Sequence, residues 1–278
     1  ILESQNSRQI ELLLKNNTVS YIVSLEERQI VELLYLALST RKITIEGFQQ
    51  IFGVSKSTIF SDIQLIKEEL ADYSLEIRYI PQKGYYLEGE EFSLRELLNK
   101  KVGQLGNAQL SDMFQQMTDE ALKDLIGKEF DFRQCIKNAI ALYEKKEQIN
   151  LVPIYADYDL IIILIACIRC GKGYHFNIDK QEEEALRELH EFESVQDIIF
   201  YLRENGFALC DREIYYIFIN MLGISNFSFN TKTEEKDYIN KITNRFVSNV
   251  EKNAKILIQT KDTLVEKLVL HIRPMFYR

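Results

Sequence analysis

The sequence predicts a mainly α-helical protein, with one small β-hairpin between a helical head and a longer, all-helical remainder. Apolar residues recur at three- and four-residue spacing along most of the chain, and the period changes to two around residues 75–87. Tyr and Phe are plentiful, Pro and Gly are few and Trp is absent, a balance that favours helices. The 278 residues are enough for two domains or slightly more.

The chain opens with a lead-in segment, residues 1–23, whose single apolar stripe fits either a helix or the tail of a preceding domain. Ser24 and Glu27 then form a capping-box signature, in which each side chain satisfies a backbone amide of the other residue. The box opens a helix with an apolar core face, made of Ile30, Leu33, Leu34, Ala37 and Leu38. We expect this helix to support a first domain that spans residues 24–90.

Residues 44–71 predict two helices joined by a tight turn. Gly53 permits a sharp exit from the first helix, and the Ser55 hydroxyl caps the second, which is amphipathic. The apolar residues of the two helices are Ile45, Phe48, Ile51 and Phe52, then Ile59, Ile63, Ile66 and Leu70. Small polar side chains and a lysine at a helix N-terminus suit close approach to phosphates and to base edges in a major groove. We expect the first two turns to expose such residues, namely Lys56, Ser57, Ser61 and Asp62.

Residues 75–87 predict a β-hairpin. Leu75, Ile77 and Tyr79 alternate with polar neighbours, and the turn at Pro81-Gln82-Lys83-Gly84 leads back into Tyr85-Tyr86-Leu87. A helix, a turn, a longer helix and a hairpin in this order are the pattern of a winged helix-turn-helix domain.

The residues of this stretch resemble the winged helix of the Mga and sugar-operon activator families. That pattern is close to V-S-basic-x-T-apolar-x-x-D, followed by K-G-Y-x-L-x-G. The matching positions are Val54, Ser55, Lys56, Thr58, Asp62, Lys83, Gly84, Tyr85, Leu87 and Gly89, whereas Ser61 stands where the family often has arginine. The resemblance implies a regulator, an activator in this family, that binds double-stranded DNA. Its contacts would come from Ser55, Lys56, Ser57, Thr58 and Ser61 on the helix and from Lys83 and Tyr85 on the wing.

The charge of the chain limits the DNA affinity that we expect. Residues 41–87 carry six Lys or Arg (41, 42, 56, 67, 78, 83) and six acids (46, 62, 68, 69, 72, 76), and the whole chain has a net charge of −8. A general nucleic-acid coat is excluded because it needs a basic surface. We expect weak DNA binding from one copy and useful affinity from a homodimer. The alternative is a regulatory interaction module whose winged helix serves assembly without touching DNA.

After residue 90 the pattern predicts only helices. We expect a helical domain over residues 91–230 and the start of a second one, cut off early, over residues 231–278, so that the chain would be a fragment of a longer protein. A linker helix follows Glu91, and residues 103–111 are rich in helix breakers. Further helices are predicted over Met113–Ile126, Asp131–Lys146, Asp157–Cys170, Gln181–Leu189, Ser194–Glu204 and Asp211–Leu222.

Two apolar helices that end on arginine, at Arg169 and Arg278, suggest tandem copies of one domain. The second resembles the start of a PTS regulation domain (PRD), in which a histidine stands seven residues before the arginine. His271 matches that histidine and is a phosphoacceptor candidate, and the resemblance implies sugar phosphotransferase phosphocarrier proteins as partners. The pattern also has a second histidine, seven residues after a glutamate. In the first copy the two positions hold Ile162, seven residues before Arg169, and Asn220, seven after Glu213, so we assign no phosphorylation there.

No cofactor or metal is expected. Cys167-x-x-Cys170 with His175 nearby resembles half of a metal site, but Cys135 and Cys210 are isolated in the sequence, so buried thiols are favoured. Four cysteines in a chain of this length favour a reducing cytoplasm. No enzyme motif is present, and the longest apolar run, Leu160–Ile168, is too short to cross a membrane.

Overall fold

The computed structural model describes residues 23–82, 84–106, 108–151, 153–222 and 233–254, with a few single residues beyond. The chain is mainly helical with one two-stranded sheet in this part, which confirms the predicted fold class. The predicted lead-in segment up to residue 22, the wing-tip residue Lys83 and the phosphoacceptor candidate His271 lie outside the described residues.

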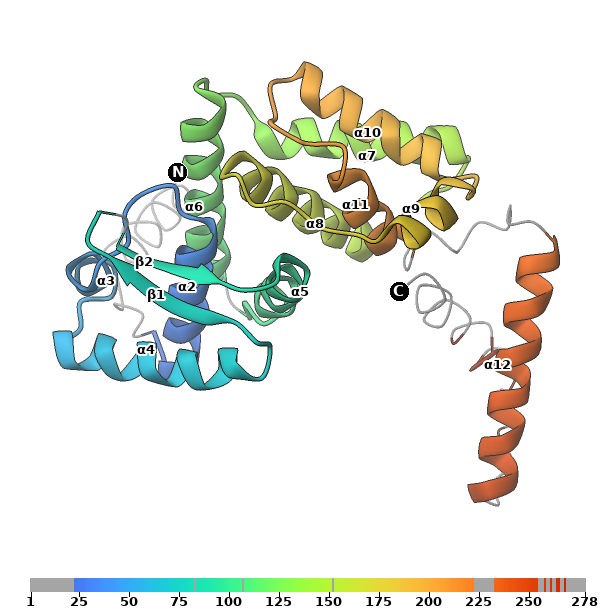
Figure 1. Ribbon diagram of the computed structural model, residues 1–278, viewed down its shortest axis with the longest axis horizontal. Helices are drawn as coiled ribbons and strands as arrows, with labels where there is room; N and C mark the ends of the chain where they lie inside the picture. Colours follow the sequence, from blue (N-terminus) through green and yellow to red (C-terminus); the bar gives the residue numbers. More distant parts are fainter. Residues whose placement is uncertain are drawn as a thin grey trace, which may run out of the picture.

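The head of the molecule is a winged helix-turn-helix (Figure 1). It contains α2 (Leu25–Leu38), α3 (Ile45–Phe52), α4 (Lys56–Ala71), β1 (Glu76–Ile80) and β2 (Gly84–Glu88). The two strands are antiparallel, with Ile77 opposite Leu87 and Tyr79 opposite Tyr85. The predicted capping box opens α2, because the Ser24 hydroxyl accepts from the Glu27 amide and the Glu27 carboxylate accepts from the Ser24 amide.

Gly84 fixes how the wing meets the rest of the head. Residue 43 pairs with the start of β2, and the Tyr85 amide donates to the Ile43 carbonyl at 2.9 Å. Gly84 has a φ of 77°, and a Cβ at this position would lie 2.2 Å from the Ile43 oxygen. Only glycine fits both this backbone conformation and this close approach.

The remainder is a helical bundle built around α8 (Pro153–Gly171). The helices that precede α8 are α5 (Glu91–Val102), α6 (Ala108–Ile126) and α7 (Phe132–Glu147), and those that follow it in the bundle are α9 (Lys180–Arg187), α10 (Phe192–Glu204) and α11 (Glu213–Leu222). A further helix, α12 (Thr233–Ala254), stands apart from the bundle (Figure 1). α8 packs against α6, α7 and α11, and every side chain from Ile162 to Ile168 is buried. Ile162 and Asn220, which replace the histidines of the PRD pattern, both lie inside this bundle.

Two helices begin four or more residues earlier than their sequence patterns predicted. α6 starts at Ala108, inside the stretch of predicted breakers, and α8 starts at Pro153 instead of Asp157. Proline suits the first turn of a helix because its missing amide would find no partner there. Pro153 therefore starts the helix and does not belong to a loop before it.

The head and the bundle share one apolar core. α2 contacts α5, α6 and α8, and α6 stands between the head and the rest of the bundle (Figure 1). The buried apolar residues form one cluster that runs from the head, through α5 and α6, to α11. The predicted domain boundary at residue 90 falls at the start of α5. The apolar core continues across this point from the head into the bundle.

Candidate nucleic-acid interface

The N-terminus of α4 is an exposed cluster of hydroxyl groups. The Ser55 hydroxyl accepts from the Thr58 amide at 3.1 Å and lies 2.8 Å from the hydroxyls of both Ser57 and Thr58. Gly53, with a φ of 66°, ends α3 and allows the turn that leaves this end of α4 free. Of the five residues predicted on this helix, Ser55, Lys56, Ser57 and Ser61 are exposed and Thr58 is half-buried.

Lys56 is held only loosely. Its ammonium lies 3.3 Å from a Glu46 carboxylate oxygen and 5.8 Å from the centre of the Phe60 ring. Hydrogen bonds from its own backbone and from Lys56 hold the pKa of Glu46 below its usual value. A pair this exposed contributes little to stability, because solvent screens it. Lys56 can therefore exchange Glu46 for a phosphate at small cost.

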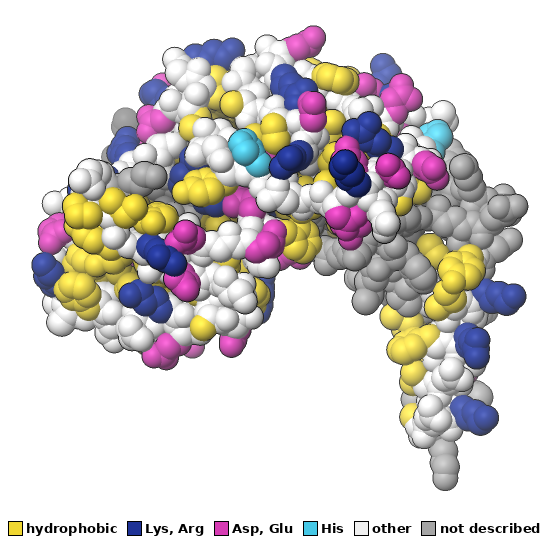
Figure 2. All heavy atoms as spheres, in the orientation of Figure 1, with side chains coloured by type: hydrophobic (Ala, Val, Ile, Leu, Met, Phe, Trp, Pro, Cys, Tyr) yellow, Lys and Arg dark blue, Asp and Glu magenta, His cyan; other side chains and the backbone are white. Residues whose placement is uncertain are grey.

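The exposed face of α4 is not purely polar. Phe60 and Leu65 are 49% and 40% exposed, and Ile51 at the end of α3 is 39% exposed although its spacing predicted a core position. Figure 2 shows hydrophobic side chains gathered on the surface at the α3 end of the molecule. Apolar groups beside hydroxyls suit contact with a thymine methyl, and they equally suit contact with another protein.

Asp62 does not lie on this face, which corrects the sequence prediction. Its carboxylate is buried and accepts from both Nε and Nη2 of Arg28 on α2, at 2.5 and 3.1 Å. The pair fastens α4 to α2 beneath the exposed face, so Asp62 orients the helix and contacts no ligand.

Glu32 lies near this pair on α2 and is fully buried. Neither of its carboxylate oxygens has a hydrogen-bond partner. Burial, reinforced by repulsion from Asp62, raises its pKa to about 8. Glu32 is therefore mostly protonated at neutral pH. Sequence reasoning missed it because it stands on the core side of α2 among apolar residues.

The wing presents a pair of tyrosines. The Tyr79 and Tyr85 rings are 4.9 Å apart, Tyr79 is exposed and Tyr85 is half-buried against the head. Burial and the nearby Tyr79 raise the pKa of Tyr85. The predicted contact residue Tyr85 thus braces the wing, while Pro81 and Gln82 at the described part of the turn are exposed.

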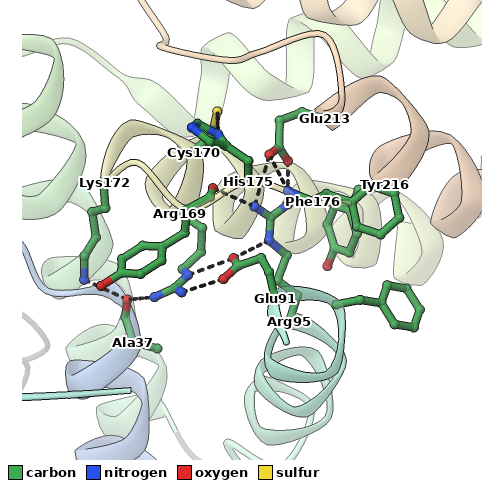
Figure 3. Close-up of polar contacts among 12 residues, drawn as sticks. Ala37, Glu91, Arg95, Arg169, Cys170, Lys172, His175, Phe176, Glu213 and Tyr216 are labelled. Atoms are coloured by element: carbon green, nitrogen blue, oxygen red, sulfur yellow. Dashed lines mark hydrogen bonds and ion pairs between the residues drawn. The ribbon is translucent and has the colours of Figure 1, made fainter. Parts of the chain in front are cut away.

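A buried ionic network joins the head to the bundle (Figure 3). Glu91 at the start of α5 accepts from Arg95 at 2.7 Å and from Arg169 of α8 at 2.6 and 2.9 Å, and Arg95 also binds Glu213 of α11. Burial opposes ionisation of Glu91, but the two arginines outweigh it and hold its pKa below the usual value. Burial also opposes the charge of Arg95. The carboxylates of Glu213 and Glu91 outweigh it and raise the pKa of Arg95.

The same network reaches the end of α2. The Arg169 guanidinium donates to the Ala37 carbonyl at 2.9 Å, and the Lys172 ammonium donates to the carbonyls of Ala37 and Ser39 at 2.8 and 2.7 Å. Burial, together with repulsion from Arg169, lowers the pKa of Lys172 to about 7. Cations from the bundle thus complete the C-terminal turn of the head's first helix, whose carbonyls have no partner within the helix.

Comparison with known proteins supports the resemblance of the winged helix to the Mga family. The described chain consists of a winged helix-turn-helix followed by an all-helical bundle. Residues 9–100 match the Mga helix-turn-helix domain. Residues 9–100 are therefore similar to an Mga-type domain. Over 258 residues the chain is 21% identical to a protein of Bacillus subtilis (strain 168) described as a probable licABCH operon regulator. The match covers 91% of this chain and 39% of that protein.

No helix within the described residues has the length and hydropathy that a membrane crossing requires.

Proposed function

We propose that this chain is the DNA-binding and regulatory part of a bacterial transcription regulator that acts in the cytoplasm. The main support is the N-terminus of α4, where Ser55, Lys56, Ser57 and Ser61 are exposed together at the positive end of a helix. In an Mga-type domain this end would enter the major groove. Its hydroxyls would contact base edges and phosphates, and Lys56 would pair with a phosphate.

The wing would supply the second contact. Lys83 at its tip would bind the adjacent DNA backbone, and Tyr85 would hold the wing at its angle because it packs against the core of the head. Because residues 41–87 have no net charge, one head gives little electrostatic affinity. We therefore propose a homodimer in which two heads bind together and the helical bundle sets their spacing.

The test is duplex binding by the full chain at several salt concentrations, with duplexes selected on the wild-type chain from a random pool. Lys56→Ala and Lys83→Ala should each weaken binding and lower the salt slope by about 1, the loss of one phosphate contact. Lys137→Ala is the matched control, because Lys137 is an exposed lysine on α7 in the bundle. If neither head variant differs from this control, the assignment is wrong.

We also propose that the regulator is an activator linked to sugar phosphotransferase signalling through His271. Phosphorylation would add up to about two negative charges to a helical interface, enough to reseat a dimer contact. Incubation with labelled phosphoenolpyruvate, a phosphotransferase phosphocarrier protein and the enzyme that transfers phosphate from phosphoenolpyruvate to that carrier should label the wild-type chain and leave His271→Ala unlabelled. Equal labelling of both chains would reject His271.

A second candidate is an interaction module without DNA contact, favoured by the exposed side chains of Phe60 and Leu65 on α4. If this face is an interface between copies, Phe60→Ser should convert dimers into monomers in light scattering. DNA binding that persists in a monomeric Phe60→Ser chain, or a dimer that survives the change, would argue against this candidate.

A further inference from the structure

Four side chains with metal-binding groups meet beside the network that joins the head to the bundle. Cys170 is at the end of α8, His175 follows in the next loop, Cys210 is in the loop before α11, and Glu213 begins α11. Their ligand atoms all lie within 4.8 Å of one another. Within the described residues this is the one group of three or more His, Cys, Asp and Glu residues with such a geometry.

The cluster corrects one point of the sequence interpretation, the isolation of Cys210. Cys210 is not isolated, because the loop before α11 returns to the end of α8, where its amide donates to the Cys170 sulfur at 3.2 Å. Cys167, the other cysteine of the C-x-x-C pattern, lies one helical turn earlier and is buried in the core. Burial raises its pKa well above the usual range. Cys170 therefore shares the cluster with Cys210, 40 residues further along the chain, and not with Cys167.

The distances fit a tetrahedral zinc ion. The Nδ1 atom of His175 lies 3.5 Å from the Cys170 sulfur and 3.6 Å from the Cys210 sulfur. Bonds of about 2.3 Å to sulfur and about 2.0 to 2.1 Å to nitrogen place these atoms about 3.6 Å apart in a tetrahedron. Glu213 Oε1 lies 4.0 Å from the Cys210 sulfur, and all four ligand atoms lie within 4.8 Å of one another, so the carboxylate would move closer to take the fourth corner.

The surroundings of the cluster suit a bound cation. The Glu213 carboxylate is fully buried and oriented by Arg95, and its Oε1 also accepts from the Phe176 amide at 3.4 Å (Figure 3). The amide of Cys210 would stabilise the Cys170 thiolate in the same way. Such contacts behind the ligands orient them and tune their affinity. Two thiolates and one carboxylate would carry a charge of −3, which one divalent ion and the Arg95 guanidinium balance together.

We propose that Cys170, His175, Cys210 and Glu213 bind one Zn²⁺ ion. All four positions are taken by protein groups, which is typical of a structural site and leaves no open position for substrate. The ion would tie the end of α8 to the start of α11 and fix Glu213. Because Glu213 holds Arg95, zinc would also stabilise the network that reaches α2. This site does not depend on DNA binding by the head.

The test is metal content of the full chain, purified without a chelating tag, equilibrated with ZnCl₂ and dialysed. The wild-type chain should retain one zinc per chain, and CoCl₂ in its place should give the visible bands of tetrahedral cobalt and a thiolate charge-transfer band. His175→Ala and Cys210→Ser should each lose more than about 100-fold in affinity, beyond the cost of altering a supporting contact. Both residues lie outside the core, so these variants should keep the wild-type circular dichroism.

Cys135→Ala is the matched control, because Cys135 is a buried cysteine of α7 outside the cluster. It should bind zinc like the wild type. Retention of less than one zinc by the wild-type chain, or equal affinity in His175→Ala and Cys210→Ser, would overturn the proposal. An intact mass two hydrogens lighter in air, without zinc retained under reductant, would also overturn it and would assign the thiols to a disulfide.

Discussion

Arg169 offers the sharpest test of how the head and the bundle are held together. Its buried guanidinium makes two hydrogen bonds to Glu91 and one to the Ala37 carbonyl. Arg169→Met keeps much of the side-chain volume but leaves Glu91 with Arg95 as its one remaining cation in the network. Removing one partner of a buried pair typically costs about 3 to 5 kcal/mol. Because Arg95 remains, we expect a loss of about 3 kcal/mol in the free energy of unfolding.

The matched control is Arg78→Met on the wing. Arg78 also lies 2.5 Å from a carboxylate, that of Glu88, but both side chains are about half exposed, at 54% and 52%. The expected loss is therefore below about 1 kcal/mol. Urea unfolding followed by circular dichroism measures both variants. A loss for Arg169→Met that equals the loss for Arg78→Met would refute the reasoning.

A second substitution tells whether Arg169→Met is destabilising because an attraction is lost or because Glu91 keeps an underpaired charge. If Arg169→Met is costly because Glu91 remains charged and underpaired, adding Glu91→Gln should recover part of the loss. The double variant should then be more stable than the sum of the two single losses predicts. Strict additivity would mean that the two residues do not interact in solution.

The remaining predictions concern the head. Between its unfolded pKa near 4.5 and its folded pKa of about 8, Glu32 binds a proton more tightly in the folded chain, so stability should fall as pH rises. Glu32→Gln should therefore gain up to about 1.4 kcal/mol per pH unit relative to wild type across this window in urea melts, and a constant difference would contradict the assignment. Gly84→Ala places a Cβ against the Ile43 carbonyl and should cost more than about 2 kcal/mol, unless the wing shifts, which amide chemical shifts would reveal. Ser55→Ala removes a cap and should cost about 1 kcal/mol, whereas Ser55→Gly should cost only a few tenths.

Local features of the head could be predicted because they depend on neighbours in the sequence. The capping box, the turn at Gly53, the cap at Ser55 and the hairpin all follow from contacts over a few residues. Asp62 was also predictable in principle. It stands three residues after Ile59 and four before Ile66, so helical spacing places it at the edge of the buried stripe, where a charge needs a partner.

The long-range contacts could not be predicted in this way. Arg169 lies 78 residues from Glu91, and Glu213 lies 118 residues from Arg95. The pattern of apolar residues fixes which face of each helix is buried. It does not fix which helices contact each other, or at which positions along the helices they do so. The cluster around Cys170 depends on the same packing, since Cys210 reaches it only because α11 lies against α8.

The end of α2 shows why the head and the bundle behave as one body. A free-standing winged helix would need its own groups or water for the carbonyls of Ala37 and Ser39, yet here Arg169 and Lys172 of the bundle bind them. Rotating the head away would uncover these carbonyls, strand the charge of Glu91 and open the shared apolar core, each at a cost of a few kcal/mol. In the homodimer that we propose, a signal received by the bundle would therefore have little scope to swing the head on a hinge at residue 90. It would act most cheaply by moving head and bundle together, which would change the distance between the two heads.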